Sequence, residues 1–110
     1  MLYLMKTGIC VRVGYCKDGN LLSTFRRYRT NSSDPILLGW SLGSRHDEYM
    51  ILGRLSKQYT ATYKYWYPDE SAVIGEWKNW CLDIDLEASN LTGNDLIDYI
   101  KGIDKLTKQP

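Results

Sequence analysis

Apolar and polar residues alternate near the start of the chain in a pattern that predicts β-strands. One face of the extended segment ICVRVGY carries Ile9, Val11, Val13 and Tyr15. KDGN follows with the residues of a tight turn, and LLSTFRRYRT is then expected as the returning strand. The pattern therefore predicts a first hairpin over residues 9–30.

A loop, a buried strand and a helix are expected next. NSSDP has loop chemistry, and Pro35 restricts the backbone of Asp34. The apolar run ILLGWSL is typical of a short buried strand. Ser44, with Asp47 three residues later, favours a helix over RHDEYMILGRL. Gly53 weakens that helix, so a strand stays open as the alternative.

Two further strands are predicted in the second half. In YTATYKYWY the tyrosines alternate with threonines, a lysine and a tryptophan, which indicates a strand. PDES breaks it, and SAVIGEWKNW then forms either a hairpin partner or a short helix. WCLDIDLE alternates again, with an inward face made of Trp80, Leu82, Ile84 and Leu86.

The chain ends in a predicted amphipathic helix. Thr92 and Asp95 have the spacing of a capping box. The apolar positions that follow repeat at helical spacing: Leu96, Ile97, Ile100, Ile103 and Leu106. Together these elements predict one α+β domain over residues 1–110, with an antiparallel sheet of about five or six strands and the C-terminal helix packed on one face.

Aromatic residues are the unusual part of the composition. They make up 13% of the chain, as nine tyrosines, four tryptophans and one phenylalanine. Tyr and Trp combine an apolar ring with a polar tip and are enriched where proteins bind partners. Hydrophobic residues at 44% and charged residues at 25% are ordinary for a globular domain. The composition therefore favours a globular binding protein.

Charge is divided between the two halves of the chain, although the formal net charge is only +1. Residues 1–66 hold ten lysines and arginines against four acids, whereas residues 67–110 hold four against nine. Two opposite poles would favour oriented docking or self-association, and we therefore consider a homodimer.

The sequence also predicts where the protein resides. No apolar run has the length of a membrane span, and MLYLMK is too short for the apolar core of a signal peptide. Three cysteines are an odd number, which favours reduced thiols. We expect a cytoplasmic protein that contacts no membrane and needs no cofactor.

The first functional hypothesis is a small non-enzymatic inhibitor, of the immunity or counter-defence type, that blocks the functional surface of another protein. Tyr, Trp and Arg dominate binding hot spots, and no catalytic set is assembled in the sequence. An acidic row on the outer face of the predicted strand WCLDIDLE would meet a basic partner. The residues expected to bind the partner are Tyr63, Tyr65, Trp66, Asp83, Asp85 and Glu87.

The alternative hypothesis is a module that sequesters a nucleotide or a short RNA. Three arginines surround a tyrosine in RRYR, and planar guanidinium groups match phosphate oxygens while aromatic rings stack on bases. The same cluster on a strand is otherwise a solvated surface, with its arginines split between two faces. The residues expected to bind this ligand are Arg26, Arg27, Tyr28, Arg29 and Trp40.

A third hypothesis comes from PDESAVIGEWK. Through Pro68, Asp69, Glu76 and Lys78 this stretch resembles the PD…ExK signature of metal-dependent nucleases, and the resemblance implies phosphodiester hydrolysis. Asp69 and Glu76 would be about 23 Å apart on strands or about 10 Å apart on a helix. One metal ion cannot bridge either distance, so this function ranks third.

Overall fold

The apolar run at the start of the chain forms the central strand of a three-stranded antiparallel sheet. In the computed structural model, which describes residues 1–29, 34–80 and 82–108, β1 (Leu2–Thr7) lies between β2 (Cys10–Tyr15) and β3 (Ile36–Ser41). Met1 to Met5 are all buried, as expected for a strand that is covered on both faces. β1 and β2 form a hairpin that turns at Gly8, and the φ of +62° at this residue favours glycine.

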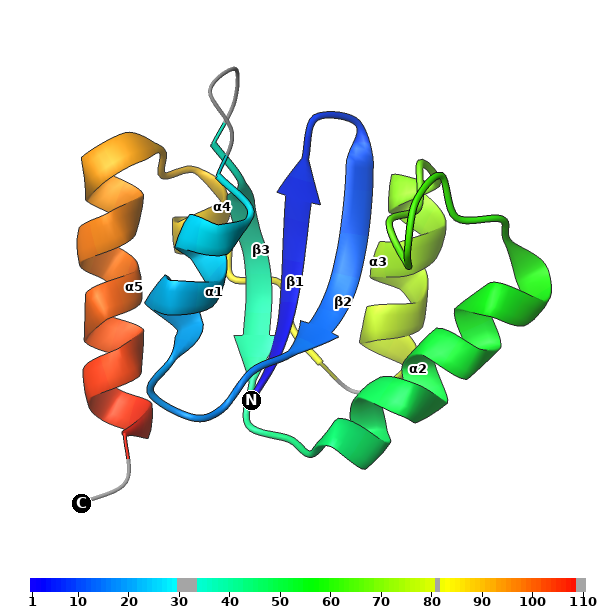
Figure 1. The fold of residues 1–110 in the computed structure, drawn as a ribbon, viewed down its shortest axis with the longest axis horizontal. Coiled ribbons are helices and arrows are strands. Elements are labelled where there is room, and N and C mark those ends of the chain that lie inside the picture. The colour runs from blue at the N-terminus through cyan, green and yellow to red at the C-terminus, as the bar shows by residue number, and fades with distance from the viewer. Residues whose placement is uncertain (30–33, 81, 109–110) are drawn as a thin grey trace.

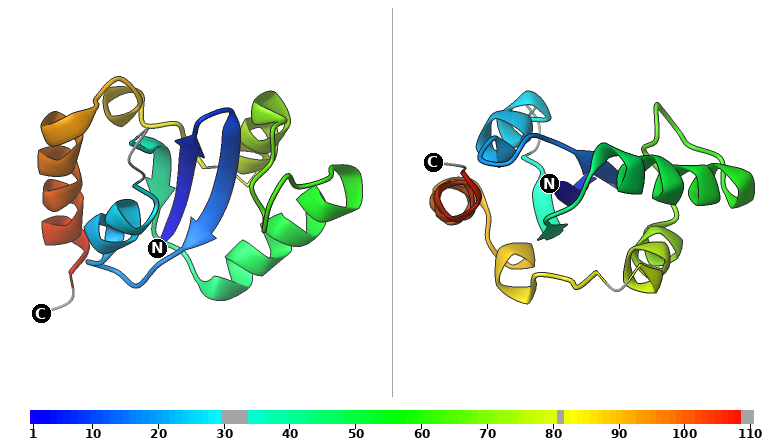
Figure 2. Two further views of the ribbon diagram at one scale, coloured as in Figure 1. Left: turned by 45° about the horizontal axis from the view of Figure 1, so that its top comes forward. Right: turned by 90° about the horizontal axis from the view of Figure 1, so that it is seen from below.

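Helices surround this sheet on both faces (Figure 1). The described residues form α1 (Leu21–Arg27), α2 (Arg45–Gln58), α3 (Glu70–Asn79), α4 (Leu86–Ser89) and α5 (Gly93–Thr107). α1 lies on one face, which we call the front face, and α3 and α4 lie on the other, while α2 and α5 flank the sheet (Figure 2). None of these helices has the length and apolar character that crossing a membrane requires. The α+β class and the C-terminal helix are confirmed.

The number of strands was predicted wrongly. The described residues contain three strands instead of five or six. Three segments that were predicted as strands form a helix (residues 21–27), a turn (residues 59–67) and an irregular connection (residues 82–85). In each segment, contacts with distant parts of the chain determine the structure, and the local alternation of apolar and polar residues does not reveal those contacts.

Residues 21–27 form the helix α1 and not the second strand of a hairpin. Leu21 and Phe25, four positions apart, are both fully buried, which is the spacing of one helix face. The side chain of Asn20 makes no capping hydrogen bond. Instead, the carboxylate of Asp104 in α5 accepts hydrogen bonds from the backbone N–H groups of Leu21 and Leu22, at 2.7 and 2.9 Å. A distant residue therefore caps this helix.

Residues 59–67 form a turn and not a regular strand. Tyr67 makes an isolated bridge to Val11 at the edge of β2, and Tyr63 bridges to Trp66 within the turn itself. Lys64 and Tyr65 have φ values of +30° and +67°, which are rare outside glycine. We call residues 61–67 the aromatic turn.

The described residues of WCLDIDLE, Trp80 and residues 82–87, do not form the predicted strand. Residues 82–85 run beside β3, where the N–H of Asp85 donates to the carbonyl of Leu38 at 2.8 Å. The helix α4 begins at Leu86, and its N-terminus is capped by the Asp85 side chain. Leu86, predicted to face inward, is 73% exposed. Among the described residues, one backbone hydrogen bond to β3 takes the place of the predicted ladder.

The remaining predictions are largely confirmed. ILLGWS is the strand β3, and the segment after Ser44 is the helix α2, with the predicted capping box between Ser44 and Asp47. SAVIGEWKN belongs to the helix α3. In α5, Ile100 and its apolar neighbours are buried, but Leu106 is exposed and Thr92 makes no side-chain capping bond.

Candidate functional site

Three segments that are distant in sequence meet on the front face. Arg12 of β2 places its guanidinium carbon 5.7 Å from the ring centre of Tyr28, just after α1, and 6.0 Å from that of Trp66 in the aromatic turn. The two rings meet edge to face with their centres 5.2 Å apart. The result is a cation that contacts two aromatic rings over the outer strand of the sheet.

A pair of tyrosines extends this cluster toward the centre of the sheet. The hydroxyl groups of Tyr3 and Tyr28 lie 2.7 Å apart in a hydrogen bond. Tyr3 in β1 pairs with Gly14 in β2. A Cβ added to Gly14 would come within 2.2 Å of the Tyr3 phenol. Glycine at this position is therefore what allows the tyrosine ring to lie flat against the strand.

The Tyr3 hydroxyl is held in its protonated form. Burial, assisted by the hydrogen bond to Tyr28, raises the pKa of Tyr3 far above the usual value for tyrosine. A protonated phenol can donate a hydrogen bond to an anionic oxygen at any physiological pH, but it does not serve as a base there.

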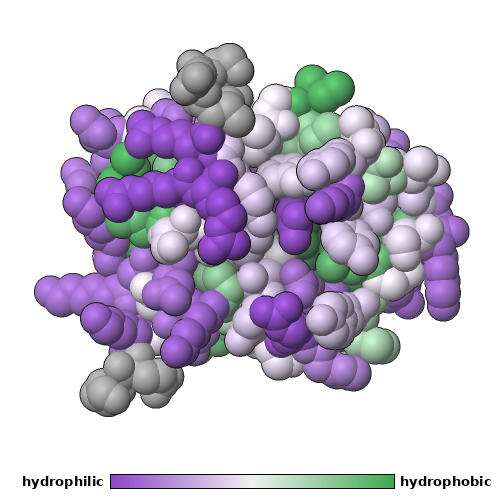
Figure 3. Space-filling model, viewed as in Figure 1, coloured by the Kyte–Doolittle hydropathy of each residue, from purple (hydrophilic) through white to green (hydrophobic). Residues whose placement is uncertain are grey.

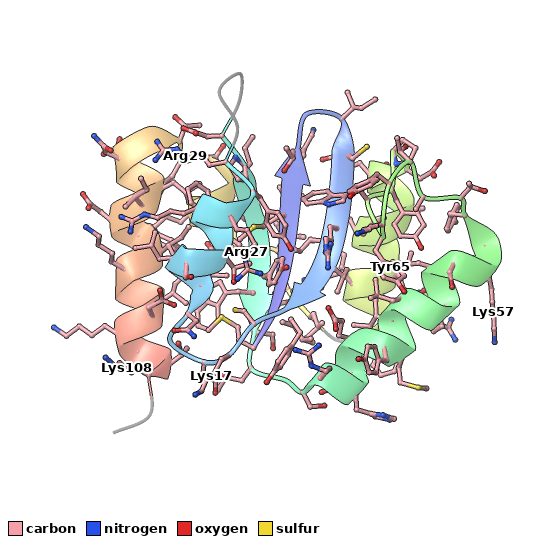
Figure 4. All side chains as sticks on the ribbon, viewed as in Figure 1. Lys17, Arg27, Arg29, Lys57, Tyr65 and Lys108 are labelled. Carbon is pink, nitrogen blue, oxygen red and sulfur yellow. The ribbon has the colours of Figure 1, made fainter. Side chains whose placement is uncertain are left out.

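Unpaired cations surround the cluster. Arg26 and Arg27 are exposed, and within the described ranges no acid lies at ion-pair distance from Arg12, Arg26 or Arg27. Arg27 lies beside the strands, whereas Arg29 lies toward α5 (Figure 4). Strongly hydrophilic side chains gather over α1 on this side of the molecule (Figure 3). The front face is therefore both aromatic and cationic.

We call Tyr3, Arg12, Arg27, Tyr28 and Trp66 the arginine–aromatic site. The structure brings Tyr28 together with Trp66, although the sequence placed them in two different hypotheses, and Arg27 precedes Tyr28 at the end of α1. The structure separates Arg29, which pairs with Asp34 at 2.7 Å, and Trp40, whose indole N–H donates to Asp85 at 3.2 Å. Trp40 lines a different surface groove, next to Tyr99 in α5.

Tyr3 and Arg12 were missed by the sequence analysis. Arg12 interrupts the apolar run VRVGY on the face opposite Val11 and Val13, so its side chain had to lie on a less apolar surface. The charge in the middle of an otherwise apolar strand was the signal that could have found it. Tyr3 gave no signal, because the segment around it was not predicted as a strand.

The acidic row does not lie along one strand. Asp83 and Glu87 are exposed, but Asp85 is half-buried and accepts hydrogen bonds from the Tyr99 hydroxyl at 2.6 Å and the N–H of Ala88 at 3.0 Å, besides Trp40. Burial, followed by the bond to Asp85, raises the pKa of Tyr99. Asp85 therefore holds α4, α5 and β3 together, and a role in partner binding stays a prediction for Asp83, Asp85 and Glu87.

Tyr63 and Tyr65 project from the aromatic turn. They are 63% and 48% exposed, whereas Trp66 between the turn and the sheet is half-buried. Figure 4 shows Tyr65 on the outer side of β2. The three residues that the sequence proposed as partner-binding are thus divided between an exposed tip and the arginine–aromatic site.

The nuclease-like stretch does not form a shared carboxylate site. Asp69 stands at the start of α3, while Glu76 is buried two turns later and accepts hydrogen bonds from Arg54 and from the indole N–H of Trp80. Across residues 1–29, 34–80 and 82–108, no three His, Cys, Asp or Glu side chains converge as metal ligands.

Known proteins provide no relative from which a function could be transferred to this chain. No protein-family model matches the chain, and neither curated proteins nor solved structures show a significant match to it.

Proposed function

We propose that this protein binds a phosphate-bearing ligand, a nucleotide or a short single-stranded RNA, at the arginine–aromatic site. The observation that carries this proposal is the position of Arg12. Its guanidinium is packed against the rings of Tyr28 and Trp66, no acid pairs with it in the described part of the chain, and its buried Nε has no hydrogen-bond partner there. Such a group is suited to receive an anion from outside.

The chemistry around Arg12 supports the same ligand. Arg27 supplies a second guanidinium on this face, and the half-buried Tyr28 has a hydroxyl whose proton is free for a ligand when Tyr3 donates the hydrogen bond between the two phenols. Arginine forks bind two phosphate oxygens at once, and aromatic faces stack on bases of any sequence. Cations and rings together favour a nucleotide unit over a bare carboxylate.

A short ligand fits the overall charge better than a long duplex. Proteins that bind long duplexes without sequence preference usually carry a large positive net charge, because affinity comes from many phosphate contacts. The formal net charge of this chain is +1. We therefore propose a site that contacts two or three phosphates.

Binding without chemical turnover is part of the proposal. The charged side chains of the arginine–aromatic site are cations, and burial raises the pKa of Tyr3 so that its phenol stays protonated at neutral pH. Hydrolysis needs a general base or an activated water, and neither is supplied by these five side chains.

The test measures the affinity of purified protein for a fluorescent single-stranded RNA and for a mononucleotide, by fluorescence anisotropy at fixed salt. Arg12→Gln and Arg27→Gln should each weaken binding about tenfold or more, the scale of a charge-assisted hydrogen bond. Arg45→Gln is the matched control, because Arg45 lies at the start of α2 and stacks on Tyr15 outside the site. Circular dichroism checks that each variant is folded.

Two results would count against this function. Equal affinities for the wild type and both site variants would remove the arginine–aromatic site from binding. Release of cleaved RNA by the wild type in the presence of Mg²⁺ or Mn²⁺, absent in Arg12→Gln, would replace binding by hydrolysis.

The exposed tip of the aromatic turn supports a second candidate, the inhibitor that blocks a partner protein. Tyr63 and Tyr65 lie in a turn where Lys64 and Tyr65 have positive φ, and strained exposed residues cluster at binding sites. Tyr63→Ala with Tyr65→Ala should abolish recovery of a specific protein from extracts of the native host. Recovery that is unchanged by the double substitution would reject this candidate.

A further inference from the structure

A small pocket adjoins the arginine–aromatic site. It has a volume of about 240 Å³, and its apolar lining comes from Thr7, Cys10, Thr62, Tyr63 and Trp66. Thr7 and Cys10 face each other across β1 and β2 and form its floor, next to Arg12 on the same side of β2. The aromatic turn forms its wall, and the indole ring of Trp66 therefore borders both the pocket and the Arg12 guanidinium.

Two buried polar atoms at this place have no partner. In the part of the chain that the structure describes, Thr7 Oγ1 and Arg12 Nε are the buried side-chain nitrogen and oxygen atoms without a hydrogen bond. Folded proteins leave few such atoms unpaired, since each costs free energy when it is withdrawn from water. Both lie on the front face of the β1–β2 hairpin, which indicates that polar atoms of a ligand complete the site.

The wall of the pocket is held in place before any ligand arrives. Within the turn, the N–H of Thr62 donates to the carbonyl of Trp66 at 2.8 Å, and the N–H of Trp66 donates to that of Tyr63 at 2.7 Å. Arg12 Nη1 donates to the carbonyl of Lys64 at 3.4 Å. Arg12 thus supports the turn while its buried Nε has no partner among the described residues.

We propose that this pocket receives the planar base of the ligand whose phosphate lies on Arg12. The inference rests on the proposed function and adds the part of the ligand that is recognised. One base inserts beside Trp66 and Tyr63 over the Thr7–Cys10 floor, and a polar atom of the base or its sugar bonds to the Thr7 hydroxyl. Only an unstacked base can enter, so the ligand is a nucleotide or a single strand.

The experiment separates base recognition from phosphate binding. Anisotropy competition compares a short single-stranded RNA with an abasic ribose-phosphate strand of equal length, and a nucleoside monophosphate with ribose 5-phosphate. The wild type should prefer the base-containing member of each pair about tenfold, within the range of base–aromatic stacking. A strand that binds more tightly than the mononucleotide identifies single-stranded RNA as the ligand, and equal affinities identify the nucleotide.

Two variants localise that preference. Thr7→Val keeps the side-chain shape and removes the hydroxyl, and Trp66→Leu removes the ring. Each should reduce the preference for the base severalfold while affinity for the abasic strand is kept in Thr7→Val. Thr60→Val, at an exposed threonine before the turn, is the matched control and should behave as the wild type.

The outcomes distinguish this inference from the function on which it rests. Equal affinity of the wild type for base-containing and abasic ligands overturns the base pocket and leaves phosphate binding in place. A preference that survives in both variants also overturns the pocket. Failure of every ligand to bind overturns the proposed function together with this inference.

Discussion

The two faces of the sheet differ in how completely they are closed. On the back face, Leu4, Val11 and Val13 are fully buried against α2 and α3, and Trp77 fills the space between helix and strands. These side chains are apolar apart from the indole N–H of Trp77, which donates to the carbonyl of Asp83 at 2.9 Å. Among the described residues, the buried side-chain nitrogen and oxygen atoms without a hydrogen bond, Thr7 Oγ1 and Arg12 Nε, both lie on the other face, so the back face serves stability.

The front face is closed over β1 and β3 but not over β2. α1 and α5 pack on Tyr3 and Met5, whereas β2 presents Cys10 and Arg12 to the space between α1 and the aromatic turn. A charged side chain and unpaired polar atoms lie there, in place of methyl groups. One sheet thus combines a face closed by apolar side chains with a face on which polar atoms of the described residues are left unpaired.

The largest expected effect comes from breaking the closed face. Trp77→Ala removes the largest fully buried side chain and its hydrogen bond, so the free energy of unfolding should fall by about 3–5 kcal/mol. Urea denaturation measures it. Where the variant stays folded, its affinity for ligand should match the wild type, and a selective loss of binding would contradict this division between the two faces.

A smaller effect is expected from breaking the open face at Gly14. Gly14→Ala places a methyl group against the phenol of Tyr3, which must move and lose its bond to Tyr28, at a cost of about 1–3 kcal/mol. Ligand affinity should fall as well. Gly53→Ala is the matched control, because an added Cβ there meets open space in α2 and should stabilise the helix by about 0.5–1 kcal/mol.

The free energy of unfolding should fall at alkaline pH because of Tyr3 on the front face. Because burial raises the pKa of Tyr3 in the folded state above the ordinary value of 10.0, the unfolded chain releases that proton first. The contribution of Tyr3 to stability is thus full below about pH 10 and is lost as pH rises beyond it. Tyr3→Phe should flatten this decline in urea denaturation measured from pH 9 to pH 11, and an unchanged slope would exclude Tyr3 as its source.

The smallest effect on stability is expected at the exposed acids. Asp83→Ala with Glu87→Ala should change the free energy of unfolding by no more than about 0.5 kcal/mol, as is usual for surface positions. Asp85→Ala should cost more, since it removes the acceptor of Trp40, Tyr99 and Ala88. Weakened capture of a host protein by the double variant alone would support the acidic pair as a partner-binding surface, and unchanged capture would remove it.

Local patterns were sufficient to predict an element when its capping residues or its buried apolar face lie within the element's own sequence. The capping box of Ser44 and Asp47 closes within three residues, and the apolar stripe of α5 needs only helical spacing to bury Leu96 and Ile100. Alternation was insufficient in the aromatic turn. It groups Tyr63 and Tyr65 with Tyr67 on one face, but only Tyr67 finds a strand to pair with.

The sequence by itself determined the α+β class, the helices α2 and α5, the strand β3 and the enrichment in tyrosine and tryptophan. Only the tertiary structure decided that residues 21–27 are a helix, because their N-terminal cap is a carboxylate from α5. It also decided the candidate site. Arg12, Tyr28 and Trp66 come from three segments, and their contact depends on strand pairing and helix packing that no local spacing encodes.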